Sequence, residues 1–432
     1  MADLCRKRTA FIINTMIKEN MMLRKVEERD WKTPLYADFA RSEYNDRLAK
    51  IRKHMQKEKI DVLVLWDEKN IRYFTGFHNN LFHAGSFQPA IVLIPIDKDP
   101  VIIVPDFFCG VVEGYTYLHD IRLMVDPHVT ANVRNTPVMV ADTVKELGFG
   151  KGRIGQESGS LGGMTIPRPL NDIEKYKAEL SGATFVDAAD IIWKVRSIKS
   201  PAEIEALKKA TRASIDTYTE LVGAFHLGMT EKEVGLFIRK GLLDKIHDVE
   251  PPLVTASGRR IPMYDIPAFD EGIPLNSGDR LILEPLPSYK GYYGSCCRIF
   301  NIGPLRDDVL RRAELVDVIQ EKAIAVVKPG LTTGDLWLAM NEGFQEVGEE
   351  YVFDQGGHGV GLNIHEPPMI ARGEDLLVEE GMVLAIETWT IGKVSEEMEF
   401  GEVYGVEDYV VVTRDGCDVF PGYPKKQRVL GG

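Results

Sequence analysis

The chain has 432 residues, of which 44% are hydrophobic and 27% are charged, and its formal net charge at pH 7 is −13. This length suits two large or three smaller globular domains, and the apolar share is enough for each to bury a core. Because an acidic protein repels phosphate groups, we expect neither nucleic acid nor an anionic membrane surface as a partner, and the charge favours a small cationic or zwitterionic ligand.

The first 42 residues are rich in Lys and Arg and carry a helical pattern up to residues 31–34. Their apolar stretch FIINTM is followed by Lys18 and Glu19, too soon for the hydrophobic region of a signal peptide. We predict an N-terminal arm over residues 1–42, which either packs on a partner subunit or is a tail without a role.

Residues 43–195 alternate between helical and strand patterns. After Ser42, the residues Tyr44, Leu48, Ile51 and Met55 recur at helical spacing. Apolar runs at 61–66, 90–96 and 101–106 predict buried strands, 138–147 predicts a helix, and 153–155 and 184–192 continue the alternation. This order of elements predicts an α/β domain.

A helix start marks the end of this domain. Ser200 suits the N-cap of a long helix, Pro201 its first turn and Glu203 the capping-box position three residues later. We therefore place the boundary here, and the second domain covers residues 196–432.

The second domain has a different order of elements. Helices are predicted at 201–225, 231–247, 306–327 and 333–347, and strands at 253–258, 280–303, 382–390 and 404–413. Helices followed by antiparallel strands predict an α+β domain whose sheet is covered by helices on one face.

The cysteines and apolar runs indicate a compartment. Five cysteines are scattered along the chain without CxxC spacing, and the vicinal pair Cys296–Cys297 is interpreted as strand filler. No disulfide framework is predicted, which favours a reducing environment. No apolar run approaches the roughly 18 residues of a membrane span. We therefore expect a cytoplasmic protein.

The stretch Gly356–Pro367 reads GGHGVGLNIHEP and contains two histidines, His358 and His365. The alternation of Val360, Leu362 and Ile364 indicates a strand, on which residues seven apart face opposite sides. If both imidazoles serve one site, the glycines must supply a bend or bulge. The alternative is a pair of structural histidines in a glycine-rich turn.

Three glutamates, Glu284, Glu387 and Glu407, each interrupt a strand that is otherwise apolar. A carboxylate in such a strand is costly to bury unless it is paired, protonated or bound to a metal ion. Any one of them alone could lie on a solvated strand face. Three carboxylates and two histidines in the same predicted domain instead indicate a shared site.

These motifs resemble a known family. GHGVGLNIHEPP, GMVLAIE, GVEDYVVVT and the pair SGDRLILE and YKGYYGSCCR resemble the pita-bread enzymes creatinase, prolidase, aminopeptidase P and methionine aminopeptidase. NIRYFTGF and VRSIKSPAEIEALKKA resemble the two-domain creatinase and prolidase branch. The resemblance covers roughly residues 43–425. It implies an N-terminal α/β domain over 43–195, a C-terminal pita-bread catalytic domain over 196–432, and a homodimer.

The resemblance also implies a degenerate metal site. Metallopeptidase members hold two divalent ions with two Asp, one His and two Glu, and His358, Glu387 and Glu407 match three of these ligands. Glu284 and Ser295 stand where the two Asp belong, and His365 matches the outer histidine that handles protons. Because two dications need bridging carboxylates, we expect no dinuclear centre and favour no metal cofactor. The alternative is one divalent ion of Mn, Fe, Zn or Co, held by Glu284, His358, Glu387 and Glu407.

Two further features bear on the reaction. The segment before the GD turn at 278–279 contains no histidine, although both peptidase members and creatinase carry one there, and Gln88 stands where creatinase has an arginine. The glutamate in LILEPLPSY resembles that of ectoine-hydrolase-like members. We therefore predict a hydrolase of this family that cleaves a C–N bond in a small amino-acid-derived, cationic or zwitterionic compound.

The predicted catalytic residues are Glu284, His358, His365, Glu387 and Glu407. Glu284 acts as nucleophile or as general base, and a histidine donates a proton to the leaving nitrogen. The predicted substrate-binding residues are Tyr292, Arg298, Arg372, Trp389 and His83. Three alternatives stay open: an Xaa-Pro dipeptidase or aminopeptidase with an altered metal site, a lyase acting on a sulfonium or ammonium substrate, and a non-catalytic pita-bread binding protein.

Overall fold

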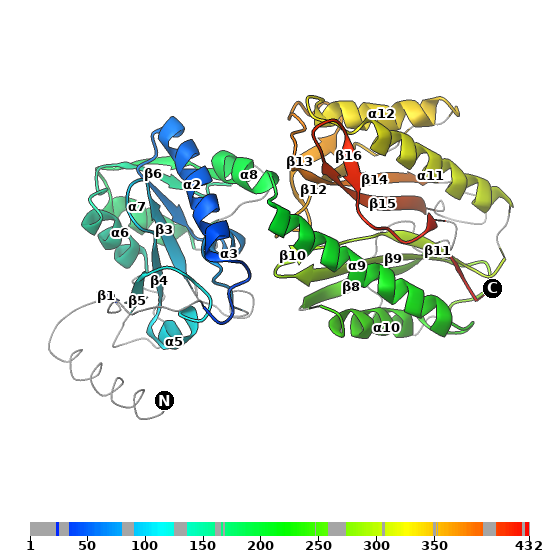
Figure 1. The fold of residues 1–432 in the computed structure, drawn as a ribbon, viewed down its shortest axis with the longest axis horizontal. Helices are drawn as coiled ribbons and strands as arrows, with labels where there is room; N and C mark the ends of the chain where they lie inside the picture. The colour runs from blue at the N-terminus through cyan, green and yellow to red at the C-terminus, as the bar shows by residue number, and fades with distance from the viewer. Residues whose placement is uncertain are drawn as a thin grey trace. The chain divides into compact units, whose positions relative to one another are not determined.

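The computed structural model describes residues 23–25, 34–79, 90–124, 136–159, 166, 169–246, 248–257, 274–304, 307–348, 351, 353–391, 403–425 and 428–431. Residue contacts divide the chain into two compact units, Met1–Val195 and Arg196–Gly432 (Figure 1). Among the described residues, none of the helices combines the length and apolarity that a bilayer span requires.

The first unit is built on a seven-stranded sheet in the order β1-β5-β4-β3-β2-β6-β7. Its pairs β2–β6, β6–β7 and β4–β5 are parallel, and β2–β3, β3–β4 and β1–β5 are antiparallel. The strands are β1 (Leu23–Lys25), β2 (Val62–Leu65), β3 (Ile91–Pro95), β4 (Val101–Pro105), β5 (Asp120–Met124), β6 (Arg153–Gln156) and β7 (Thr184–Asp187). The helices are α2 (Arg41–Glu58), α3 (Glu68–Thr75), α5 (Cys109–Val112), α6 (Thr136–Glu146), α7 (Leu170–Glu179) and α8 (Ala189–Ser197), with a short 3₁₀ turn η1 (Asp106–Phe108).

This unit confirms the predicted α/β fold. Its apolar strands β2, β3 and β4 are buried along their whole length, as runs of Val, Ile and Leu predict for a sheet packed on both faces. The buried carboxylate of Glu157 lies just after β6 and accepts hydrogen bonds from the backbone N–H of Trp66 and Asp67, at 2.6 and 2.9 Å, and from the Asn70 amide. This carboxylate therefore joins the end of β6 to the start of α3.

One part of the predicted N-terminal arm belongs to this sheet. Leu23–Lys25 forms the edge strand β1, where Leu23 lies opposite Met124 of β5. The sequence pattern predicted a helix there, whereas pairing with β5 gives these residues a strand conformation. The other residues of the arm before Pro34 lie outside the described part of the chain.

The second unit is built on a ten-stranded sheet with the main order β10-β9-β11-β15-β14-β12-β13, which β8, β16 and β17 extend from β9, β15 and β11. The strands are β8 (Asp248–Ser257), β9 (Arg280–Tyr289), β10 (Tyr292–Tyr293), β11 (Arg298–Ile302), β12 (Gln355–Gly359), β13 (Glu366–Ala371), β14 (Val383–Ile391), β15 (Val403–Val412), β16 (Cys417–Val419) and β17 (Val429–Leu430). The helices are α9 (Pro201–Ala224), α10 (Glu231–Leu243), α11 (Asp307–Val326) and α12 (Thr333–Gln345).

The four helices cover one face of this sheet, as predicted. Leu281 and Leu283 of β9 pack in the core that α9 and α10 form, and Leu384 and Ile386 of β14 pack in the core that α11 and α12 form (Figure 1). Side chains alternate along a strand, so the residues directly before and after these side chains face away from the helices. Glu284, which follows Leu283, is one of them.

The start of α9 confirms the capping prediction. Ser200 is the N-cap, its hydroxyl accepts from the Glu203 backbone N–H at 3.2 Å, and the Glu203 carboxylate accepts from the Ser200 N–H at 2.8 Å. Pro201 occupies the first helical position, where its missing N–H costs nothing.

The histidine stretch departs from the predicted single strand. Residues 355–359 form β12, residues 360–365 turn back, and residues 366–371 form the antiparallel strand β13. Gly357 has φ +143°, and a Cβ on Gly359 would lie 2.6 Å from the Pro367 carbonyl oxygen. The prediction of a strand over Val360–Ile364 was wrong, whereas the predicted bend between the two histidines is present.

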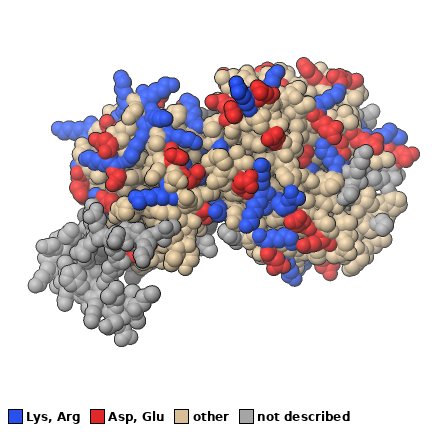
Figure 2. All heavy atoms as spheres, viewed as in Figure 1, with Lys and Arg blue, Asp and Glu red and all other residues tan. Residues whose placement is uncertain are grey.

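Charge is unevenly divided between the units. Residues 1–195 contain 27 Lys and Arg against 26 Asp and Glu, and residues 196–432 contain 25 against 39. Figure 2 shows numerous basic side chains on one face of the first unit, while both signs are interspersed on the second. The acidic excess of the chain therefore belongs to the unit that holds the three glutamates.

Candidate active site

A row of polar side chains crosses four strands of the second sheet. Glu387 of β14 lies directly opposite Glu407 of β15. Arg298 of β11 lies opposite both Val406 and Leu283, so the antiparallel register brings Cys297, the residue before it, level with Glu407 and Glu284. Opposite residues of paired strands share a face. The carboxylate row, defined as Glu284, Cys297, Glu407 and Glu387, therefore lies on the face away from the helices.

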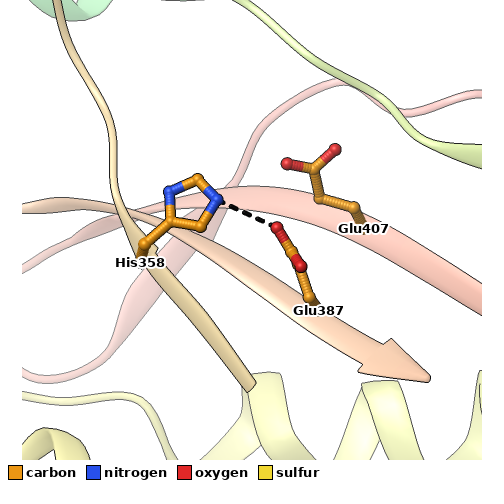
Figure 3. A group of neighbouring side chains, drawn as sticks. All are labelled: His358, Glu387 and Glu407. Carbon is orange, nitrogen blue, oxygen red and sulfur yellow. Dashed lines mark hydrogen bonds and ion pairs between the residues drawn. The ribbon is translucent and has the colours of Figure 1, made fainter. Parts of the chain in front are cut away.

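His358 joins this row from β12. It lies opposite Ala385, two residues from Glu387, and so on the same face of the sheet. Its Nε2 is 2.9 Å from Glu387 Oε1, and its Nδ1 is 2.8 Å from the Gly359 carbonyl oxygen. Figure 3 shows the imidazole directed at Glu387, with Glu407 beside them. One ligand atom from each of these three residues lies within 4.8 Å of the other two.

The charges of His358 and Glu387 stabilise each other. Burial lowers the pKa of His358, but the hydrogen bond and charge of Glu387 raise that pKa above its usual value overall. Burial acts on Glu387 in the opposite sense, and the hydrogen bond and charge of His358 hold the pKa of this carboxyl below its usual value. Each partner therefore favours the charged form of the other.

The surroundings of Glu284 and Glu407 favour the protonated carboxyl group, in contrast to those of Glu387. Burial, and then the charges of Glu407 and Glu387, raise the pKa of Glu284 well above its usual range, and its buried Oε2 has no hydrogen-bond partner in the structure. Burial and the charge of Glu387 raise the pKa of Glu407 to about 7. Several carboxyl groups in one place cannot all ionise without a cation.

Ser295 contacts Glu407 directly. Its hydroxyl donates to Glu407 Oε2 at 2.5 Å, and the Cys297 backbone N–H donates to the same oxygen at 3.2 Å. Both bonds favour the ionised form of Glu407. The residue at this position therefore offers a donor to the neighbouring carboxylate in place of a second negative charge.

His365 lies beside His358, as a shared site requires. The two ring centroids are 4.1 Å apart, and His365 is exposed whereas His358 is buried. Burial of its ring and the charge of His358 lower the pKa of His365, so its imidazole is neutral at pH 7. A neutral exposed imidazole can accept a proton and pass it on.

An apolar wall borders the row at Trp389. This buried indole donates from Nε1 to Glu387 Oε2 at 3.3 Å and packs with Ile282, Cys297 and Ile299. Across the strand pair lies Gly405, where a Cβ would overlap the indole ring. The absence of a side chain on Gly405 therefore makes room for Trp389, whose predicted role in substrate binding is compatible with this position.

Arg298 has another role than the predicted substrate contact. As the residue after Cys297, it faces the opposite side of the strand. Its guanidinium donates to the carbonyls of Cys297 and Glu407 at 2.9 and 2.6 Å, and to Asp408 Oδ1 at 2.5 Å. Because all of these partners are protein groups, Arg298 anchors β15 from behind and does not neutralise the row.

Three other predicted substrate contacts have different surroundings. The Tyr292 hydroxyl donates to Glu203 at 2.7 Å and the side chain is buried, so it anchors β10 to α9. Arg372 is exposed, lies 3.4 Å from Asp354, and stacks over the Trp337 ring, so its contacts lie outside the row. His83 lies outside the described residues.

Sequence reasoning missed two members of this face. Cys297 was interpreted as strand filler, yet it lies between Glu284 and Glu407 in the row. Tyr409 lies opposite Ala385, which in turn lies opposite His358, so its buried phenol faces the same side. Both residues stand two positions from a predicted site residue, Ser295 or Glu407, and this spacing was the available signal.

Comparisons with known proteins agree with this architecture. Residues 47–198 match the Creatinase/Prolidase N-terminal domain, and residues 205–414 match Metallopeptidase family M24. The chain is 27% identical over 395 residues to an uncharacterized peptidase of Bacillus subtilis, covering 89% of this chain and 100% of that protein. It is 25% identical over 376 residues to an Xaa-Pro dipeptidase of Pyrococcus furiosus, covering 86% and 96%.

The fold is also shared with solved structures. A dipeptidase from Pyrococcus horikoshii aligns with a TM-score of 0.75 at 22% identity, over 89% of this chain and 100% of that chain. A helix-covered sheet with glutamates and histidines together on its other face agrees with the pita-bread fold of these structures. The chain belongs to the two-domain creatinase and prolidase family, since both family models match in chain order.

Proposed function

We propose that this protein hydrolyses a C–N bond in a small amino-acid-derived compound that carries a positive charge, without a dinuclear metal centre. One observation carries the proposal. Within the described residues, the hydrogen bonds and ion pairs of the Glu284, Glu387 and Glu407 carboxylates involve no lysine or arginine. Because three adjacent carboxyl groups cannot all ionise without a counter-charge, an external cation would complete the site in its ionised form.

The residues fit a single divalent ion as one form of that cation. An imidazole nitrogen and two carboxylate oxygens within 4.8 Å are a common ligand set for Mn, Fe, Zn or Co. Such an ion would polarise a carbonyl or lower the pKa of a bound water. A second ion finds less support, because Ser295 offers a hydroxyl that is already bonded to Glu407.

A cationic substrate group is the other form, and we favour it. Glu284 keeps its proton in the absence of a cation, because burial and two neighbouring carboxylates raise its pKa. A positive charge placed against the row favours the ionised form of Glu284. Glu284 then acts as a base on water or as a nucleophile, and His365 carries a proton to the leaving nitrogen. Chemistry at Glu284 would therefore begin only when the right substrate is bound.

Two measurements test this proposal together. Protein purified without chelator is analysed for metals by mass spectrometry, and its activity is measured on amidines, guanidino acids and Xaa-Pro dipeptides. We expect at most one divalent ion per chain and turnover of an amidine or guanidino compound. About two ions per chain together with Gly-Pro cleavage would overturn it.

A matched pair of variants tests the role of Glu284. Glu284→Gln removes the carboxylate from the row and should abolish turnover while the fold persists. Glu233→Gln makes the same change at the exposed capping glutamate of α10 and should leave turnover unchanged. Full activity of Glu284→Gln would remove this residue from the mechanism.

The second candidate is an Xaa-Pro dipeptidase that uses one ion. The M24 match and the similarity to the Xaa-Pro dipeptidase of Pyrococcus furiosus favour it. Added Mn²⁺ or Co²⁺ would then stimulate Gly-Pro cleavage with saturation at one ion per chain. Under either candidate we propose a homodimer, for which light scattering would give twice the chain mass.

A further inference from the structure

Four buried charged side chains gather where α9 begins, beside the loop between β12 and β13. Two are basic, Arg196 and Lys199, and two are acidic, Glu203 and Glu366; each is at most 5% exposed. Arg196 donates to Glu366, and Lys199 Nζ lies 3.3 Å from its other carboxylate oxygen. Two positive and two negative charges balance in this charge cluster, which makes their joint burial tolerable.

The charge cluster contacts the loop between β12 and β13 at three points. Arg196 Nη2 also donates to Asn363 Oδ1 at 2.8 Å, and the Asn363 backbone N–H donates to Glu366 Oε1 at 3.0 Å. Gly361 lies so close that a Cβ there would meet Glu366 Oε2 at 2.6 Å. The loop backbone therefore packs against the Glu366 carboxylate at Gly361 and is hydrogen-bonded to it at Asn363.

This loop carries His365, the residue directly before Glu366. Its imidazole lies 4.1 Å from that of His358 and is exposed. Within the described residues, no hydrogen bond to a protein group holds the His365 ring. The location of the ring is therefore set by the backbone that the charge cluster fastens.

We infer that Glu366, with Arg196 and Lys199, is a positioning residue that holds His365 against His358. The inference gives the charge cluster a catalytic consequence that rests on the proposed function, and a structural consequence that does not. Glu366→Gln leaves two buried cations with one remaining acidic partner, Glu203. The loop should then move away from the cluster, because an uncompensated buried charge draws in water.

The structural consequence is tested without a substrate. Protein labelled with [¹⁵N]histidine gives ring signals that His365→Asn and His358→Asn assign. We expect Glu366→Gln to shift the His365 signals and leave those of His54 and His226 in place. Asp317→Asn breaks another half-buried arginine pair, with Arg428, and should leave the His365 signals unchanged. Unmoved His365 signals in Glu366→Gln would overturn the inference.

The catalytic consequence is tested on whichever compound of the panel the wild type hydrolyses fastest. Glu366→Gln should lower kcat about 10- to 100-fold with KM changed less than about threefold, and Glu366→Asp should restore part of kcat. If Glu366→Gln does not fold, Asn363→Ala keeps all four charges and should give a smaller shift and a smaller loss. Wild-type kcat in these variants would overturn the inference. A wild type inactive on every compound would count against the proposed function alone, since the histidine spectra still report on the loop.

Discussion

Gly405→Ala should destabilise the second unit more than a single methyl group ordinarily does. A Cβ at this position would overlap three atoms of the Trp389 ring, inside the 3.0 Å below which real Cβ contacts essentially do not occur. Carbon atoms pack at about 3.5–4.0 Å, so the indole must move by more than an ångström. Ile282, Cys297 and Ile299 pack against it, so that movement disturbs their packing.

Two costs combine to give the magnitude. Overpacking a tight core costs about 1–3 kcal/mol. A displaced Trp389 also loses its 3.3 Å hydrogen bond to the Glu387 carboxylate, and hydrogen bonds to charged groups contribute about 1.5–3 kcal/mol. Because one movement produces both losses, we expect the free energy of unfolding to fall by about 2.5–6 kcal/mol.

Urea denaturation followed by tryptophan fluorescence measures this loss. Gly223→Ala is the matched control, because a Cβ there meets nothing within 4 Å and the residue lies in α9. The same substitution should stabilise the helix by about 0.5–1 kcal/mol, so the two variants move in opposite directions. A loss below about 0.5 kcal/mol in Gly405→Ala would refute the reasoning about the Trp389 wall.

Three further predictions follow from buried contacts. Arg298→Lys keeps the charge, but a lysine cannot reach all the acceptors behind β15. It should therefore lower the free energy of unfolding by about 3–5 kcal/mol. The control Arg372→Lys, at an exposed arginine, should have the wild-type unfolding free energy. Ser295→Asp adds a carboxylate beside Glu407 and should raise the bound divalent ions from at most one toward two per chain by mass spectrometry; unchanged stoichiometry would contradict this. Burial raises the pKa of Glu157 to about 8, so the folded state keeps a proton that the unfolded state releases, and stability should fall as pH rises from about 5 to 8. Glu157→Gln should remove about 1.4 kcal/mol per pH unit from that slope in urea melts, and an unaltered slope would argue against it.

Local signals in the sequence predicted local structure well. The capping residues Ser200 and Glu203 predicted the start of α9, because a capping box depends on residues three apart in the chain. Strands such as β2 and β4 were predicted from uninterrupted apolar runs, which mark strands covered on both faces. The fold class followed from the order of these elements.

Register between strands was the part that the sequence could not supply. The alignment of Glu284, Cys297, Glu407 and Glu387 depends on which residues of β9, β11, β15 and β14 lie opposite one another. That pairing is decided by packing of the whole sheet and leaves no local mark. Arg298 was predicted as a substrate contact, whereas the strict alternation of faces turns it away from the row.

The error at residues 360–364 has a different cause. Val360 and Leu362 are buried, as alternation predicts, but the chain between them bends at Gly361 instead of extending. Buried Val360 and Leu362 on either side of Gly361 have the same spacing as in a strand, although the backbone bends where Gly361 packs against the Glu366 carboxylate. Only the contact between Gly361 and Glu366, which the sequence does not reveal, distinguishes the two.

The strict alternation of faces has a consequence for how such a protein changes its chemistry. Three members of the row have an immediate neighbour that bonds on the helix side: Cys297 precedes Arg298, Glu387 precedes Thr388, and Glu407 precedes Asp408. These neighbours bond to one another or to Gln320 of α11, and none of those bonds includes a side chain of the row. A substitution on the face of the row, such as Ser295→Asp, leaves these bonds intact. Side chains on this face of the sheet can therefore change while the opposite face preserves the fold.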